Sequence, residues 1–135
     1  MNWLSLPELL AIHADVIDAT GGVHGVVNAP ALESALARPF TTYDEQPLYP
    51  SFVDKLAAMI HSIIAFHPFV DGNKRTALVA AEVLLRFDNQ RISPGAEVEE
   101  FFWSIARGER NPKQIATWLA AHVERLPGQP GGANP

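Results

Sequence analysis

The stretch that decides the fold is AFHPFVDGNKRTALVAAEVLL, residues 65–85. An apolar run ends at His67, a compact polar segment follows at residues 71–75, and the chain then becomes apolar again. A polar segment between two buried helices needs hydrogen-bonding partners. Its acid, glycine and two cations, close to a histidine, therefore indicate a functional site rather than a simple connection.

The segments on both sides of this polar stretch read as helices. Upstream, apolar residues recur at offsets 0, 3, 4, 7, 10 and 11 from Val53, which is one helical face. His67 lies at offset 14, so we expect the helix to aim it inward, away from solvent. Phe66 should widen the same apolar face. Downstream, TALVAAEVLLRF is apolar nearly all round, which is typical of a helix surrounded by others.

Capping patterns predict the starts of the other main helices. Ser5 with Glu8 resembles a capping box, and Asn28, Ser51 and Asn111 can each cap a following apolar stretch. The predicted fold class is therefore all-α, with two central helices joined by the polar loop.

Three further segments complete this prediction. Residues 91–109 and 113–126 should be helices, and residues 41–50, rich in proline and aromatic residues, should form an exposed loop or small hairpin that can carry recognition. No convincing strand appears elsewhere. We expect one domain over residues 1–126 and a disordered tail over residues 127–135.

Composition limits the classes of function. The chain has 135 residues and a formal net charge of -5, which argues against broad nucleic-acid binding. It has no cysteine, so disulfides and thiolate metal sites are excluded. The first ten residues lack a basic segment, and no apolar run reaches the roughly 20 residues that span a bilayer. We expect a cytoplasmic protein without a membrane partner.

The polar segment has the parts of a phosphate site. Gly72 permits an unusual backbone conformation or a close approach. The helix that begins at residues 73–75 presents unpaired N–H groups and the positive end of its dipole. Lys74 and Arg75 add full positive charge, and an arginine can bind a phosphate through two hydrogen bonds.

Two more side chains extend the site toward catalysis. Asp71 can cap the helix, or it can hold a Mg²⁺ ion that a phosphate also ligates. His67 lies four residues upstream, and an imidazole titrates near neutrality, as a general base should. These parts suit phosphoryl or nucleotidyl transfer to a hydroxyl group.

Each residue alone has a plainer interpretation. His67 could be a core histidine, Asp71 a helix cap, and Lys74 and Arg75 solvated surface, while Phe69 should be a core plug that pins the loop. Their concentration within nine residues favours the functional interpretation. A P-loop is excluded because the spacing is wrong and a helix precedes it.

A zinc site built from His61, His67 and Asp71 is disfavoured for a geometric reason. The two histidines are six residues apart, which places them about 240° apart around a helix.

The segment HPFVDGNKRTA resembles the Fic/Doc signature, written H-P-F-x-x-G-N-G-R-x-x-R in Fic proteins and H-x-F-x-[DN]-[AG]-N-K-R in the Doc (death-on-curing) toxin branch. The resemblance extends over about residues 4–125. It implies a six-helix Fic-type fold, with residues 41–50 as the flap that docks the target. It also assigns roles: His67 as catalytic base, Asp71 as Mg²⁺ ligand, Phe69 as motif anchor, and Gly72, Asn73, Lys74 and Arg75 as the ATP phosphate loop.

Two departures from the Fic pattern bear on the reaction. Lys74 replaces a glycine, and Leu78 replaces the last arginine, which in AMP-transferring Fic proteins holds the ATP phosphates. Both changes resemble Doc, which uses ATP in the reverse orientation. The resemblance implies a protein kinase toxin that transfers the γ-phosphate to a Ser or Thr of elongation factor Tu and arrests translation. The alternatives are an adenylyltransferase and a non-catalytic interaction module.

The same resemblance implies an antitoxin partner. The inhibitory [ST]-x-x-x-E-[GN] pattern of self-restrained Fic proteins is absent, because TTYDEQ and SPGAEV fail at the last position. We therefore expect a Phd-like antitoxin whose flexible segment folds onto the toxin.

Overall fold

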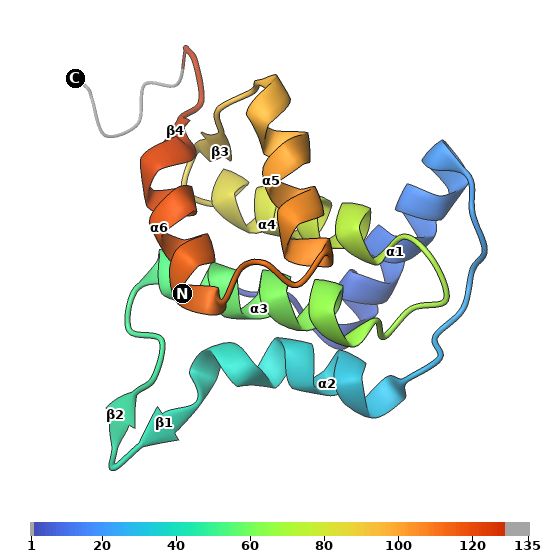
Figure 1. The fold of residues 1–135 in the computed structure, drawn as a ribbon, viewed down its shortest axis with the longest axis horizontal. Coiled ribbons are helices and arrows are strands. Elements are labelled where there is room, and N and C mark those ends of the chain that lie inside the picture. Colours follow the sequence, from blue (N-terminus) through green and yellow to red (C-terminus); the bar gives the residue numbers. More distant parts are fainter. Residues whose placement is uncertain (1, 129–135) are drawn as a thin grey trace.

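Helix α3 (Phe52–Phe66) runs through the middle of the molecule, and the other elements pack around it (Figure 1). The computed structural model describes residues 2–128. The side chains of α3 are buried on nearly all sides between Lys55 and Ile64, because α2, α4, α5, α6 and a short 3-10 helix all pack against this helix. The long apolar stretch of the sequence is therefore the centre of the core.

The predicted all-α class and the six-helix architecture are confirmed. Helix α1 packs against α4, which is the second central helix. No helix among the described residues is long and apolar enough to cross a membrane. The remaining helical elements are α1 (Leu6–Thr20), α2 (Ala29–Ala37), the 3-10 helix η1 (Arg38–Phe40), α4 (Asn73–Arg86), α5 (Ala96–Ala106) and α6 (Pro112–His122).

Side-chain caps begin four of these helices at the predicted residues. Ser5, Ser51 and Asn111 each form a complete capping box, in which the cap side chain and the third helical residue bond each other's backbone N–H groups. Asn28 accepts a hydrogen bond from the N–H of Ala31. Each such cap contributes about 1 kcal/mol to stability, so the four helix starts are encoded locally.

The flap predicted near residues 41–50 is a small hairpin. Strands β1 (Thr42–Tyr43) and β2 (Gln46–Pro47) pair in antiparallel fashion and project from the body of the molecule (Figure 1). Asp44 and Glu45 both have positive φ, at 53° and 64°, as a two-residue hairpin turn requires. All four strand residues are exposed, so the hairpin is available for contact.

A second strand pair was not predicted. Strands β3 (Gln90–Ile92) and β4 (Val123–Arg125) pair in antiparallel fashion, although we expected Arg91 and Ile92 at the start of one helix and residues 123–125 at the end of another. The pair is held by an Arg91–Glu124 ion pair of 2.7 Å. Its partners are more than 30 residues apart, and local periodicity carries no information on such pairing. Consequently α5 begins at Ala96, later than expected, and α6 ends at His122, earlier than expected.

The predicted disordered tail, residues 127–135, lies mostly outside the described residues. The domain boundary at residue 126 stays a prediction. Leu126 donates its N–H to the carbonyl of Asn89, so it still belongs to the folded unit.

A polar cluster fastens both ends of the flap to α3. Arg38 donates through Nη1 to His61 Nδ1 at 3.0 Å and to Ser62 Oγ at 3.0 Å. Its Nε donates to the Tyr49 hydroxyl at 3.1 Å. Burial and the nearby guanidinium both lower the pKa of His61, because each disfavours the charged imidazolium. His61 is therefore an acceptor for Arg38 in its neutral form.

This cluster predicts an acid-sensitive contribution to stability. The lowered pKa of His61 means that the unfolded chain binds a proton more readily than the folded chain. The stabilising contribution of neutral His61 is complete at pH values above the ordinary histidine pKa of about 6.5. It is lost as the pH falls below that value. We expect the free energy of unfolding, measured by urea denaturation, to fall less between about pH 7.5 and pH 5.5 in His61→Asn than in the wild type. Parallel pH profiles for the two proteins would contradict this assignment.

Candidate active site

His67 is exposed at the end of α3, which corrects the expectation that it points inward. The helix ends at Phe66, and His67 turns left-handed, with φ 49° and ψ 60°. Pro68 is the cause, because a proline disfavours the helical conformation of the residue before it. Phe66 is also exposed, at 55%, because thirteen residues carry it about 220° around the helix from Val53. The imidazole therefore faces solvent, where a protein hydroxyl can reach it.

The left-handed turn at His67 is strained. Such a conformation costs roughly 1–2 kcal/mol for a residue that carries a Cβ. Strain of this kind persists only where surrounding contacts hold it, and it is frequent at functional sites.

The signature loop, residues 67–72, is held by a strap formed by residues 22–28. The strap follows α1 and runs alongside the loop, so two segments far apart in the sequence share backbone hydrogen bonds. The contacts are Val27 N–H and Asn28 N–H to Pro68 O at 2.9 and 3.2 Å, Val70 N–H to Gly25 O at 2.9 Å, and an antiparallel bridge between Val26 and Phe69.

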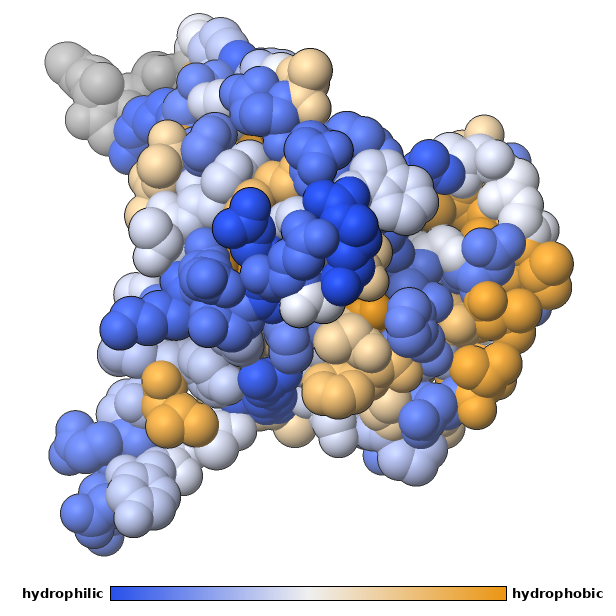
Figure 2. Space-filling view, viewed as in Figure 1, coloured by the Kyte–Doolittle hydropathy of each residue, from blue (hydrophilic) through white to orange (hydrophobic). Residues whose placement is uncertain are grey.

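The strap also carries apolar surface beside the loop. Val23, Val26 and Val27 are 58%, 42% and 64% exposed, and Val70 of the loop is 47% exposed. Figure 2 shows hydrophobic surface gathered on the side of the molecule where the strap connects α1 to α2. A protein that approaches His67 therefore meets apolar surface next to it.

Phe69 anchors the loop in the core, as the sequence predicted. It is 1% exposed and stacks on the ring of His13, with centroids 3.8 Å apart and planes 5° apart. His13 is itself buried and donates from Nε2 to the carbonyl of Asp71 at 2.9 Å. The sequence analysis did not single out His13 as part of the site. It lies four residues after Leu9 and three before Val16 on the buried face of α1. A polar residue at such a core position is the signal that could have found it.

Asn73 closes the loop on itself. Its Oδ1 accepts the N–H of Phe69 and its Nδ2 donates to the carbonyl of Phe69, both at 3.0 Å. Gly72 is left-handed, with φ 75° and ψ 19°, and a Cβ there would lie 2.9 Å from Ile17 Cδ1. Both reasons proposed for a glycine at this position, conformation and close approach, therefore hold.

Asp71 lies at the mouth of the site with an exposed carboxylate. Oδ1 accepts the N–H of Gly72 at 2.9 Å, and Oδ2 accepts the N–H of Val23 at 3.2 Å. It does not cap α4, whose N-cap is Gly72 and which has no side-chain cap. Each carboxylate oxygen keeps lone-pair capacity, so the residue fits the one-carboxylate, phosphate-sharing mode in which Mg²⁺ binds.

The first turn of α4 offers the expected anion-binding groups. Without a side-chain cap, the N–H groups of residues 73–75 remain available at the positive end of the dipole. Arg75 is exposed, with no hydrogen bond or ion pair to another described residue. It is therefore the cation best placed to meet a phosphate.

Lys74 points elsewhere than expected. Its Nζ forms a 2.8 Å ion pair with Glu99 of α5 and lies 4.7 Å from the centre of the Trp103 ring. The hydrogen bond and the charge of Lys74 lower the pKa of Glu99. A phosphate-binding role for Lys74 stays a prediction, and it requires this ammonium to exchange Glu99 for phosphate.

Comparison with known proteins identifies the family of this chain. The model of the Fic/DOC family matches residues 3–85, which include both the strap and the signature loop. The chain belongs to the Fic/Doc family, in its Doc toxin branch. "Toxin Doc" of Mycolicibacterium smegmatis is 37% identical over 105 residues, covering 76% of this chain and 81% of that protein. "Protein kinase doc" of Escherichia phage P1 is 27% identical over 122 residues, covering 88% and 94%.

The segment that the family model matches covers only part of the structure. The matched residues end within α4, and α5, which holds Lys74 through Glu99, follows them. The ion pair between Lys74 and Glu99 therefore joins the matched segment to the part of the chain that follows it.

Substituting Gly72 tests the close approach at the loop. We expect Gly72→Ala to destabilise the protein by more than Gly108→Ala, because both glycines are left-handed but only Gly72 meets a neighbour within 4 Å. Gly108→Ala should cost about 1 kcal/mol in urea unfolding, from backbone strain alone. Ile17→Val, which removes Cδ1, should cost less in the Gly72→Ala background than in the wild type. Equal losses for the two glycine variants would refute the contact.

Asn73→Ala tests the closure of the loop. Removing both hydrogen bonds leaves two partly buried backbone groups of Phe69 without partners, so we expect a loss of about 1–3 kcal/mol in urea unfolding. Arg75→Ala is the matched control, because that side chain is exposed two residues later, and it should change stability by less than about 0.5 kcal/mol. Similar values for the two variants would show that the Asn73 contacts do not hold the loop.

Proposed function

We propose that this protein is a toxin kinase of the Doc type. It transfers the γ-phosphate of ATP to a Ser or Thr hydroxyl of a translation factor similar to elongation factor Tu, and so arrests translation. The names of the two relatives, a Doc toxin and a Doc protein kinase, support this class of activity.

One observation carries the proposal. An exposed histidine, held in a strained turn, lies four residues before an exposed carboxylate and six before an uncapped helix N-terminus. The helix that precedes His67 and the helix that follows the loop are both buried, so the site is mounted on rigid elements. Positioning and charge stabilisation are what phosphoryl transfer asks of a protein.

The side chains have distinct tasks in this reaction. His67 takes the proton of the acceptor hydroxyl, whose oxygen forms a bond to the γ-phosphorus as the bond to the β-phosphate oxygen breaks and ADP leaves. Arg75 and the N–H groups of α4 bind phosphate oxygens. Asp71 would hold Mg²⁺, which when bound neutralises negative charge on the phosphates. Asn73 and Phe69 keep the loop in place.

Position 78 favours phosphoryl over AMP transfer. Leu78 is partly buried and packs against the apolar core beside Ile92 and Val98. It offers no charge to ATP phosphates. The adenylyltransferase alternative lacks the arginine that the AMP-transferring Fic pattern has there.

An antitoxin completes the proposal. A Doc-type toxin needs restraint in its own cell, and the chain carries no inhibitory pattern of the self-restrained kind. We therefore assign restraint to a Phd-like partner protein, whose flexible segment folds onto this chain. The toxin acts in the cytoplasm, where its proposed target is made and used.

Labelled ATP distinguishes the candidate reactions. We expect the purified protein, incubated with cell extract, to transfer label from γ-labelled but not α-labelled ATP to a protein. His67→Ala should lower the initial rate at least about 100-fold, because it removes the general base. The exposed Asp88→Ala, in the turn after α4 and outside both the strap and the signature loop, is the control and should label at the wild-type rate.

Other outcomes select the alternatives. Transfer of the α-label would show AMP transfer and reject the kinase assignment. No label from either nucleotide, with the wild type equal to His67→Ala, would leave a non-catalytic interaction module. Both variants should unfold within about 0.5 kcal/mol of the wild type, because the two side chains are exposed.

A further inference from the structure

Exposed apolar side chains lie on both sides of His67 in the chain. Phe66, the last residue of α3, is 55% exposed, and Val70, in the signature loop, is 47% exposed. The strap adds the exposed Val26 and Val27, because its backbone pairs with that of the loop. The candidate base therefore belongs to a surface to which α3, the loop and the strap all contribute apolar residues.

This part of the chain holds a large share of the exposed apolar surface. Of the eleven large apolar residues exposed within residues 2–128, five lie in two stretches of seven residues, 22–28 and 66–72. Single exposed apolar side chains are ordinary in soluble proteins, whereas a group of them in one place marks an interaction surface. The surface around His67 is therefore suited to contact with another molecule.

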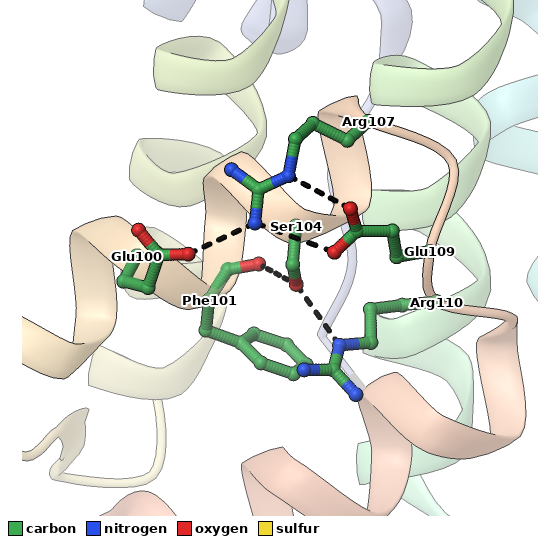
Figure 3. A network of polar contacts seen from close by, with 6 residues as sticks. All are labelled: Glu100, Phe101, Ser104, Arg107, Glu109 and Arg110. Atoms are coloured by element: carbon green, nitrogen blue, oxygen red, sulfur yellow. Dashed lines mark hydrogen bonds and ion pairs between the residues drawn. The ribbon is translucent and has the colours of Figure 1, made fainter.

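Elsewhere, the chain covers aromatic rings with its own side chains. Phe101 of α5 stacks on Trp118 at 4.3 Å, and the guanidinium carbon of Arg110 lies 5.3 Å from the centre of the Phe101 ring (Figure 3). Among residues 2–128, the ring of Phe66 has neither a stacked partner nor a cation over it. Its aromatic neighbour is His61, with centroids 6.0 Å apart and planes at 84°. Phe66 thus keeps ring surface free for an external contact.

The mounting of Phe66 makes it a rigid contact point. It ends α3, whose residues from Lys55 to Ile64 are mostly buried. The neighbouring His61 is fixed in turn, because it accepts a hydrogen bond from Arg38 at the base of the flap. A large side chain on a rigid element loses little conformational freedom when it binds, which favours aromatic residues as contact points.

The proposed reaction determines what covers this surface. A hydroxyl group that gives its proton to His67 must come within about 3 Å of the imidazole. Phe66 is adjacent to His67 in the chain, so the protein that carries the hydroxyl also lies over Phe66. Charged side chains next to the acceptor would lose water against Phe66 and the valines without gaining a partner, whereas apolar side chains would gain contact.

We propose that Phe66 is a specificity-determining residue that, with Val70 and the strap valines, selects acceptor Ser or Thr residues flanked by apolar side chains. This inference rests on the proposed kinase function and adds the class of acceptor sequence to it. In an extended segment, side chains two positions apart lie on the same side, roughly 7 Å from one another. The acceptor faces His67, and the residues two positions before and after it contact Phe66 and Val70.

Substitution of Phe66 tests this inference in the extract assay with γ-labelled ATP. We expect Phe66→Ala to raise the amount of extract that gives the half-maximal rate at least about tenfold. The maximal rate and the KM for ATP should stay within about twofold, because the ring contacts the acceptor rather than the nucleotide. Phe66→Leu, which keeps an apolar side chain, should recover most of the loss. Urea unfolding of each variant confirms that it folds.

Phe87→Ala is the matched control. Phe87 is 51% exposed, close to the value for Phe66, and it follows the last residue of α4, whereas the signature loop precedes the first. Its removal should leave the maximal rate, the half-saturating amount of extract and the KM for ATP within about twofold of the wild type.

Peptides measure the sequence preference directly. One peptide of ten residues has a central threonine with leucines two positions before and after it, and the other has glutamines at those two positions. We expect the wild type to label the leucine peptide at least about tenfold faster than the glutamine peptide. Phe66→Ala should reduce this ratio, whereas Phe87→Ala should not.

Several results would overturn the inference while leaving the kinase assignment intact. In each, the wild type labels the extract. They are an unchanged half-saturating amount of extract in Phe66→Ala, a parallel loss of maximal rate and ATP affinity, and equal or absent labelling of the two peptides. A wild-type dimer that Phe66→Ala converts to a monomer in sedimentation would assign the surface to a second copy instead. Absence of any γ-label transfer by the wild type would reject the proposed function itself.

Discussion

The backbone of residues 68–70 pairs with that of residues 25–28, and the candidate site depends on this pairing. It fixes the loop between the two central helices on both sides of Phe69. Once the loop is fixed, His67 remains in its strained turn and Gly72 approaches Ile17. The hydrogen bonds from His13 and Asn73 then hold the carbonyl groups of the loop in place. Backbone pairing therefore supports a geometry that the loop residues would not keep alone.

The two central helices contribute different groups to the site because of how α3 ends and how α4 begins. Helix α3 ends where Pro68 prevents it from continuing, so the last side chain before the loop turns to solvent. Helix α4 begins without a side-chain cap, so its first N–H groups stay available to a ligand. A capped start would be more stable, and the other main helices of the first half all have one. Among the six described α-helices, only α4 and α5 lack a side-chain cap, and the start of α4 lies where an anion is expected to bind.

The two cations at the start of α4 have different surroundings. Lys74 holds α5 through Glu99 and Trp103, whereas Arg75 remains exposed beside the α4 N-terminus. The same α5 also packs against α3. A ligand that drew Lys74 toward phosphate would release one contact of α5. The Lys74 side chain thus links the start of α4 to α5 through an ion pair and a contact with an aromatic ring.

Local sequence determined the helix class, four helix starts, the flap turn and the residues of the signature, because caps, prolines and helical spacing act within a few residues. Tertiary structure decided what depends on distant partners. Periodicity placed His67 inward, but the turn at Pro68 and the pairing with the strap face it outward. The β3–β4 pair, the support of Asp71 by His13 and the Glu99 partner of Lys74 join residues 25 or more positions apart. Such contacts form only when the whole chain has packed.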